Sequence, residues 1–122
     1  MAGVPSIGPS EAAAELEAGA GQSGSPLLVD VRERDEFEAR RAVGAVLLPI
    51  SELVARHEEL PKDRPLLMIC EAGSRSMSAT MFLMQRGWTD VRNVDGGTQA
   101  WAAAGLPVRQ GTPDPGEGDL PG

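Results

Sequence analysis

The only cysteine of the chain, Cys70, lies where an apolar run ends and a loop of small residues begins. The stretch 68–79 reads MICEAGSRSMSA, so Cys70 is followed by Gly73 and then by a permanent cation, Arg75. If this loop folds over the start of the next helix, backbone N–H groups and the positive end of the helix dipole form an anion cradle. A thiol in such a cradle loses its proton readily, and the thiolate is the nucleophilic form of cysteine. The alternative is that Cys70 is a small buried hydrophobic side chain.

The other residues of the loop fit an anion cradle. Gly73 permits backbone angles that a residue with a Cβ resists, and Ala72 and Ser74 are small enough to leave the cradle open. Glu71 could contribute to this loop, but an exposed loop residue without a function explains it equally well.

Because Cys70 is the single cysteine, the chain cannot form an intramolecular disulfide. A zinc site would need more ligands than Cys70 and the single His57, unless carboxylates or another chain complete it. The cysteine count therefore excludes a disulfide-stabilised secreted scaffold and favours a reducing compartment. We expect no metal site and no cofactor.

Short apolar runs alternate with helical stretches, and these elements must position the loop. Buried strands are predicted over residues 27–31, 42–50, 66–70 and 90–94. Helices are predicted over residues 11–19, 32–41, 52–60, 74–87 and 96–105. This alternation predicts an α/β fold in which a small parallel sheet is covered by helices on both faces. Ligands bind beyond the carboxyl ends of the strands in such sheets, and Cys70 lies at such an end.

The predicted core is mainly aliphatic, because the chain has two Phe, two Trp and no Tyr. Trp88 and Trp101 are expected to lie in the core or to cover it, and His57 is expected to be a surface residue of its helix. The helix over 74–87 offers four large apolar side chains for packing: Met77, Met81, Phe82 and Met84.

Composition divides the 122 residues into three parts. Residues 1–9 contain Gly and Pro and are predicted to form a flexible lead-in, and residues 10–110 form one domain. Residues 111–122 are almost entirely Pro, Gly and acidic residues, which predicts a disordered tail.

The net charge of −7 argues against a nucleic-acid partner and against electrostatic binding to an anionic membrane. The first residues have no basic segment followed by an apolar one, and no apolar run approaches membrane-spanning length. We therefore expect a cytoplasmic protein. No apolar surface stripe stands out, which leaves the oligomeric state open and is compatible with a monomer.

Four motifs together resemble the rhodanese domain, the sulfurtransferase family, over residues 12–110. The first-strand motif is LLVDVRERDEFE, the active-site motif is ICEAGSRS, and VGAVLLPISEL lies between them. GWTDVRNVDGGTQAWAAAGLPV resembles the C-terminal signature of the family. The chain departs from the family at Arg40 and Arg41, where many members carry Gly-His. That position is not catalytic in the family, so the departure concerns local packing.

The resemblance implies a sulfur-transfer mechanism. Cys70 attacks the outer sulfur of a small anionic donor such as thiosulfate, a persulfide forms, and an acceptor (cyanide, a thiol or a protein) removes the sulfur. Backbone N–H groups from Glu71 to Ser76 stabilise the anionic sulfur, and Arg75 helps to hold the donor. Asp30 and Arg32 lie where family members brace the loop. Either a Glu71–Arg32 or an Asp30–Arg75 ion pair fits this role.

Three other functions compete with sulfur transfer. Tyrosine and dual-specificity phosphatases also use a Cys–loop–Arg cradle, but with five residues between Cys and Arg, whereas Cys70 and Arg75 are separated by four. The shorter loop encloses room for a sulfur atom and is tight for a tetrahedral phosphate. Some rhodanese-like domains are non-catalytic binding modules that have lost the cysteine, which is present here. A cysteine hydrolase would require His57 to reach Cys70 from a separate helix.

Overall fold

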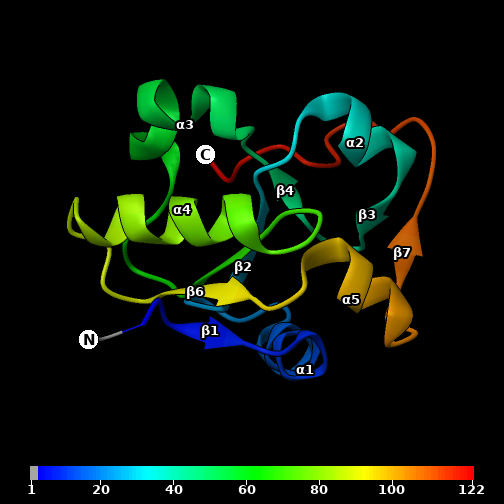
Figure 1. Cartoon of the computed structure of the whole chain (residues 1–122), viewed down its shortest axis with the longest axis horizontal. Coiled ribbons are helices and arrows are strands. Elements are labelled where there is room, and N and C mark those ends of the chain that lie inside the picture. Colours follow the sequence, from blue (N-terminus) through cyan, green and yellow to red (C-terminus); the bar gives the residue numbers. More distant parts are fainter. Residues whose placement is uncertain (1–2) are drawn as a thin grey trace.

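The computed structural model describes residues 3–122, and its centre is a five-stranded parallel sheet (Figure 1). The strand order is β1-β6-β5-β2-β4, and each neighbouring pair is parallel. These strands are β1 (Ser6–Ile7), β2 (Leu27–Asp30), β4 (Val46–Leu47), β5 (Leu66–Ile69) and β6 (Val91–Val94). A separate antiparallel pair joins β3 (Arg41–Ala42) to β7 (Val108–Arg109).

Helices cover both faces of the sheet, which confirms the predicted α/β fold. They are α1 (Pro9–Gly19), α2 (Arg34–Ala39), α3 (Ile50–Arg56), the 3-10 helix η1 (His57–Glu59), α4 (Ser74–Met84) and α5 (Gly97–Ala103). Alternate residues of β5 point to opposite faces, as the pleat requires. Met68 belongs to the core cluster beneath α3 and α4, whereas Leu67 and Ile69 belong to the cluster with α1, α2 and α5. Trp88 and Trp101 are both buried, as predicted.

One predicted strand was wrong in its extent. The run 42–50 is not a single strand, because Gly44 has a φ of 88° and interrupts it between β3 and β4. Only β4 joins the parallel sheet, whereas β3 pairs with β7. The run therefore contributes to two separate sheets.

The prediction that large apolar side chains of α4 pack inward was wrong for its methionines. Met77, Met81 and Met84 are exposed. The buried residues of α4 are Ser76, Ala79, Thr80 and Leu83, which also follow the helical period. These residues lie on the face of α4 that packs against β5 and β6.

The N-terminal lead-in is tied to the sheet, in contrast to the flexible segment predicted. Ser6 and Ile7 pair in register with Asn93 and Val94 of β6. Residues 1–2 of the predicted lead-in lie outside the described residues.

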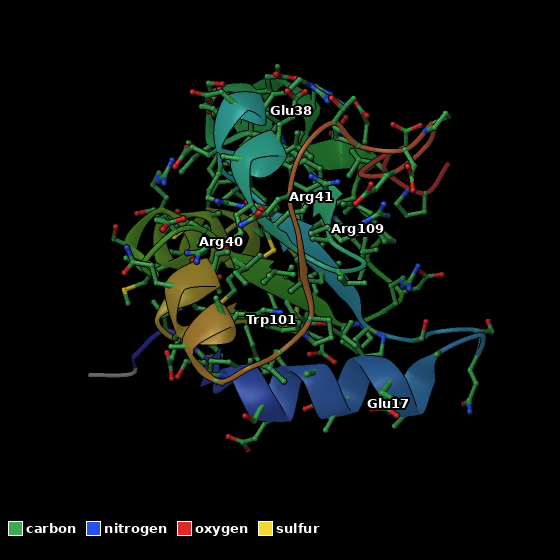
Figure 2. The ribbon with its side chains drawn as sticks, turned by 90° about the vertical axis from the view of Figure 1, so that its right-hand side faces the viewer. Glu17, Glu38, Arg40, Arg41, Trp101 and Arg109 are labelled. Carbon is green, nitrogen blue, oxygen red and sulfur yellow. The ribbon has the colours of Figure 1, made fainter. Side chains whose placement is uncertain are left out.

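The C-terminal segment also differs from the disordered tail predicted, because its few side chains find specific partners. The Gly118 carbonyl accepts a hydrogen bond from the Leu47 N–H at 2.7 Å, which covers the outer edge of β4. Glu117 forms two hydrogen bonds with Arg41, and Leu120 packs against the core. Figure 2 shows the chain beyond α5, which carries Arg109, passing beside the labelled Arg41. The exact limits of the domain, 10–110, stay a prediction.

Candidate active site

Cys70 lies at the carboxyl end of the central strand β5, where the chain turns into α4. Gly73 makes this turn possible with a φ of 109°, a region that disfavours side chains with a Cβ. The Cys70 Sγ accepts hydrogen bonds from the Gly73 N–H at 3.1 Å and from the Ser76 hydroxyl at 3.2 Å. The thiol is 1% exposed and lies beneath its own loop. Burial alone would fit a structural cysteine, but converging donors to sulfur do not.

The pKa of the Cys70 thiol is lowered by this environment. Burial is the largest single influence and acts to raise the pKa, since it disfavours the charged form. The Ser76 hydroxyl and the backbone N–H groups of Ser76, Gly73 and Ala72 act together in the opposite direction and outweigh burial. The balance favours the thiolate, which is the form that reacts with electrophilic sulfur.

The N-terminus of α5 fixes the orientation of the loop backbone. The Cys70 carbonyl accepts hydrogen bonds from the Thr98 N–H at 2.8 Å and the Thr98 hydroxyl at 2.9 Å. The Glu71 carbonyl accepts one from the Gln99 N–H at 3.0 Å. These bonds hold the two carbonyl groups toward α5 and away from the thiol. A Cβ at Gly97 would lie 2.5 Å from the Cys70 carbonyl oxygen, so glycine is required there.

Ser76 is held in place by Asn93 of β6. The Ser76 hydroxyl lies 2.5 Å from the Asn93 Oδ1, and the Asn93 amide donates to the Gly73 carbonyl at 3.3 Å. Both Ser76 and Asn93 are buried. Since a hydroxyl has one proton, Ser76 can donate either to Asn93 or to the Cys70 sulfur, and a negative charge on sulfur favours the second.

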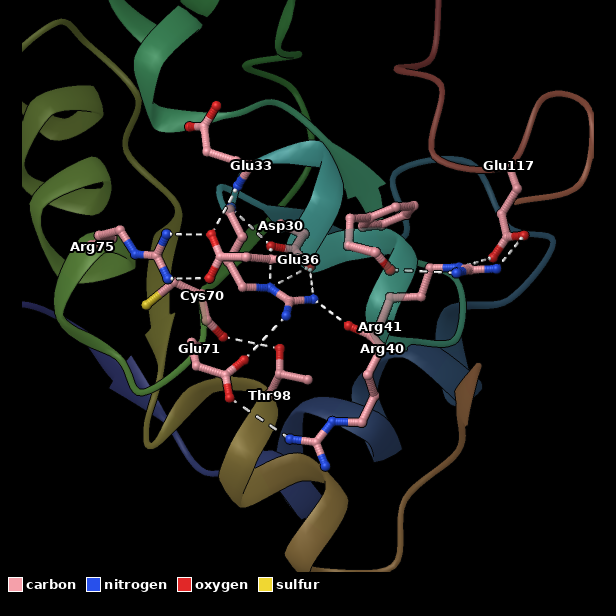
Figure 3. Close-up of polar contacts among 12 residues, drawn as sticks. Asp30, Glu33, Glu36, Arg40, Arg41, Cys70, Glu71, Arg75, Thr98 and Glu117 are labelled. Carbon is pink, nitrogen blue, oxygen red and sulfur yellow. Dashed lines mark hydrogen bonds and ion pairs between the residues drawn. The ribbon is translucent and has the colours of Figure 1, made fainter. Parts of the chain in front are cut away.

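Arg32 braces the loop from below, and its contacts answer the question that the sequence left open. Its guanidinium pairs with Asp30 at 2.8 Å and with Glu71 at 3.1 Å, and donates to the Arg40 carbonyl at 2.6 Å (Figure 3). Glu71 also lies 3.7 Å from the Arg40 guanidinium. The Glu71–Arg32 pair is therefore the one that forms. Asp30 is bound by Arg32 and does not pair with Arg75.

Arg75 is bound by a residue that the sequence did not single out. Its two terminal nitrogens donate to the two oxygens of Glu36 at 2.7 and 2.8 Å (Figure 3). Arg75 lies near enough to Cys70 for the charge of the thiolate to help raise the pKa of the guanidinium. The only sequence signal was the acidic character of α2, where several carboxylates were equal candidates.

The loop residues predicted from the sequence thus come together around one sulfur atom. The Gly73 N–H and the Ser76 hydroxyl donate to it, and the backbone N–H groups of Ala72 and Ser76 also lower its pKa. In the described chain, the exposed Ser74 begins α4 without such a contact. The sequence did not indicate a role in the site for Asn93, Gly97 or Thr98.

His57 lies in a different environment. Its ring packs edge-on against Phe82 at 5.1 Å and Trp88 at 5.7 Å between centroids. This aromatic contact agrees with a non-catalytic role and gives no support to a Cys–His hydrolase. Within residues 3–122, no cluster of three or more His, Cys, Asp or Glu side chains is arranged to hold a metal ion. In the same range, no helix has the length and apolarity needed to span a membrane.

A family model described as the rhodanese-like domain matches residues 9–104. The chain belongs to the rhodanese-like domain family. A sulfurtransferase of Allochromatium vinosum is 42% identical over 82 residues, which are 67% of this chain and 77% of that protein. A thiosulfate sulfurtransferase GlpE of Vibrio cholerae is 36% identical over 81 residues, covering 66% and 76% of the two chains.

Solved structures of this family share the fold. A rhodanese-related protein of Thermoplasma volcanium has a TM-score of 0.76 and 31% identity, and the match covers 86% of this chain and 97% of that one. A thiosulfate sulfurtransferase of Pseudomonas aeruginosa has a TM-score of 0.77 and 28% identity over 89% of this chain. The match covers only 21% of the Pseudomonas chain, and 16% of a Bacillus anthracis CoADR-RHD chain. The rhodanese-like domain is therefore one part of some larger proteins.

Proposed function

We propose that this rhodanese-like domain is a sulfurtransferase that carries sulfane sulfur as a persulfide on Cys70. The observation that carries the proposal is the set of donors converging on one sulfur: the Ser76 hydroxyl and backbone N–H groups of the loop. Sulfurtransferases among the relatives support it. The donor, the acceptor and a cytoplasmic location are parts of the proposal, and neither a metal nor a cofactor is invoked.

In the first half-reaction, the Cys70 thiolate attacks the outer sulfur of thiosulfate. The new bond joins the two sulfur atoms, the old sulfur–sulfur bond breaks, and sulfite leaves with its electron pair. The product is a persulfide anion on Cys70. Its terminal sulfur carries the charge, and the loop N–H groups stabilise that charge as they stabilise the thiolate.

In the second half-reaction, a nucleophilic acceptor attacks the terminal sulfur. Cyanide becomes thiocyanate, or a thiolate becomes a persulfide, and Cys70 leaves as the thiolate. The lowered pKa of Cys70 serves this step as well, because a stabilised thiolate is a better leaving group.

The test is an intact-mass measurement after incubation with thiosulfate and removal of the excess. We expect the mass of one added sulfur atom, its loss on adding cyanide, and thiocyanate in the solution. The Cys70→Ser variant is the matched control and should gain nothing. A wild-type protein that gains no sulfur and produces no thiocyanate would refute the proposal in favour of a binding module.

A phosphatase is the rival with a related loop. Four residues separate Cys70 from Arg75, and the Arg75 guanidinium that would bind a phosphate is paired with Glu36. We expect no phosphate release from an aryl phosphate. Cys70-dependent release would instead identify a phosphatase.

A further inference from the structure

Glu36 binds Arg75, and Arg75 is the cation that an anionic donor would use. Both terminal guanidinium nitrogens of Arg75 bind Glu36, and the two side chains are only 35% and 32% exposed. Arg75 holds the pKa of Glu36 at about 2, mainly through these hydrogen bonds and despite the opposing effect of burial. Glu36 therefore stays ionised at any pH at which the protein would work.

Glu36 is fixed on its own helix and is not simply a mobile counter-ion. It accepts a hydrogen bond from the Glu33 N–H at 3.2 Å, as part of a capping box at the start of α2. Glu33 in turn accepts a hydrogen bond from the Ser51 hydroxyl at 2.9 Å. A small anion that approaches Arg75 must displace this carboxylate or lie beside it, and both cost binding energy.

The other charges around the loop do not restore a positive field. Arg32 is already bound by Asp30 and Glu71, and Arg40 lies near Glu71. The carboxylates of Asp30, Glu36 and Glu71 thus offset the guanidinium groups of Arg32, Arg40 and Arg75. The chain as a whole has a net charge of −7. A dianion therefore finds each of these guanidinium groups already paired, and it is repelled by the overall charge.

We propose that Glu36 determines the charge preference of the site: by binding Arg75, it disfavours dianionic sulfur donors relative to donors of lower charge. The preference among sulfur donors rests on the proposed function. The matched donors are thiosulfate, a dianion that releases sulfite, and an arenethiosulfonate, a monoanion that releases a sulfinate. In both cases Cys70 takes the outer sulfur and the leaving group keeps the electron pair.

The first experiment measures charge preference without any sulfur transfer. Iodoacetate and iodoacetamide alkylate the same thiolate and are similar in size, but only iodoacetate is charged. The ratio of their rates therefore cancels changes in the pKa of Cys70. We expect Glu36→Gln to raise the iodoacetate-to-iodoacetamide ratio roughly fivefold to tenfold, because Arg75 is freed. Gln at this capping position keeps the start of α2 intact.

Two further variants control this result. Glu38→Gln removes the same charge from the same helix, but Glu38 lies 3.8 Å from the exposed Arg34, so its ratio should change less than twofold. Arg75→Gln leaves Glu36 unpaired and should lower the ratio below that of the wild type. Equal ratios in wild type, Glu36→Gln and Glu38→Gln would overturn the role of Glu36.

The second experiment compares the two donors. Glu36→Gln should raise the kcat/KM for thiosulfate relative to that for the arenethiosulfonate, in the same direction as the alkylation ratio. If neither donor loads wild-type Cys70 but the alkylation ratio shifts, the sulfurtransferase proposal fails and the charge preference stands. If both donors load Cys70 and neither ratio shifts, the role of Glu36 is refuted and the sulfurtransferase stands.

Discussion

Two buried arginines, Arg32 and Arg41, support different parts of the molecule. Arg32 is 2% exposed and binds Asp30, Glu71 and a backbone carbonyl next to the Cys70 loop. Arg41 is 1% exposed and binds Glu117, together with the carbonyls of Phe37 and Gly111. A buried guanidinium needs such partners to offset its lost hydration. Each arginine therefore links segments that are far apart in the sequence.

The comparison teaches that burial of a charge does not by itself indicate a functional site. Arg32 joins β2 to the active-site loop, so its contacts affect both folding and the position of Glu71. Arg41 joins β3 to the C-terminal segment, on the far side of α2 from Cys70 (Figure 3). We expect changes around Arg32 to alter stability and reactivity, and changes around Arg41 to alter stability alone.

The largest effect is expected for Arg32→Met. Removing the guanidinium leaves Asp30 buried without its cation, which should lower the free energy of unfolding by about 3 to 5 kcal/mol. Urea unfolding at neutral pH measures this loss, and alkylation of Cys70 in the remaining folded protein should also change. Arg34→Met, at a side chain that is 65% exposed, should cost less than about 0.5 kcal/mol. A loss below about 1 kcal/mol for Arg32→Met would contradict the bracing role.

A smaller effect, of about 2 kcal/mol, is expected for Glu117→Gln, since Arg41 keeps its two carbonyl partners. Arg41 lowers the pKa of Glu117 to about 2, chiefly through their hydrogen bonds. A lowered carboxyl pKa stabilises the fold above the ordinary value of 4.5 and loses this effect as pH falls toward 2. The difference in unfolding free energy between wild type and variant should therefore be full at pH 7 and shrink below pH 4.5.

The reactivity of Cys70 distinguishes the region around Arg41 from the region around Arg32. Glu117→Gln should leave the rate of Cys70 alkylation unchanged in the folded protein, and the exposed Asp119→Asn is its charge-matched control. A change in the alkylation rate would mean that the tail and the active site are coupled.

The smallest change in the free energy of unfolding is expected for Ser76→Ala, because this substitution acts mainly on the reactivity of Cys70. Loss of the hydroxyl removes a donor to sulfur and should raise the pKa of Cys70. At a pH below both pKa values, the alkylation rate with iodoacetamide should fall about tenfold, because a hydrogen bond to a charged group contributes about 1.5 kcal/mol. Ser78→Ala, on the exposed face of the same helix, should leave the pH profile in place. An unshifted profile for Ser76→Ala would assign thiolate stabilisation to the backbone alone.

The sequence was sufficient to predict features that depend on neighbouring residues. The apolar runs at 27–31, 66–70 and 90–94 correspond to β2, β5 and β6, and the loop after β5 holds Cys70 as expected. Local patterns work here because a buried strand must be apolar and a tight turn must be small. The Arg32–Glu71 pair was one of two alternatives, since both residues flank ends of neighbouring strands.

Features that depend on long-range pairing could not be predicted. With 18 acidic and 11 basic residues, no local rule selects Glu36 for Arg75 or Glu117 for Arg41. On α4, the methionines and the small residues both follow the helical period, so periodicity could not decide which stripe is buried. The close approach of Gly97 to the Cys70 carbonyl depends on how α5 docks, which only the tertiary structure reveals.

Because the single thiol is buried, the rate at which it is labelled measures how readily the structure around it opens. A labelling reagent reaches the buried Cys70 either within the folded domain, where a small shift of the loop admits it to the site, or after the whole domain unfolds. The two routes differ in their response to denaturant, because global unfolding exposes much more surface than a loop displacement. Labelling rates that rise steeply with urea would report the domain, and rates independent of urea would report the loop. One natural cysteine thus allows pulse labelling to resolve the dynamics of the site without an introduced probe.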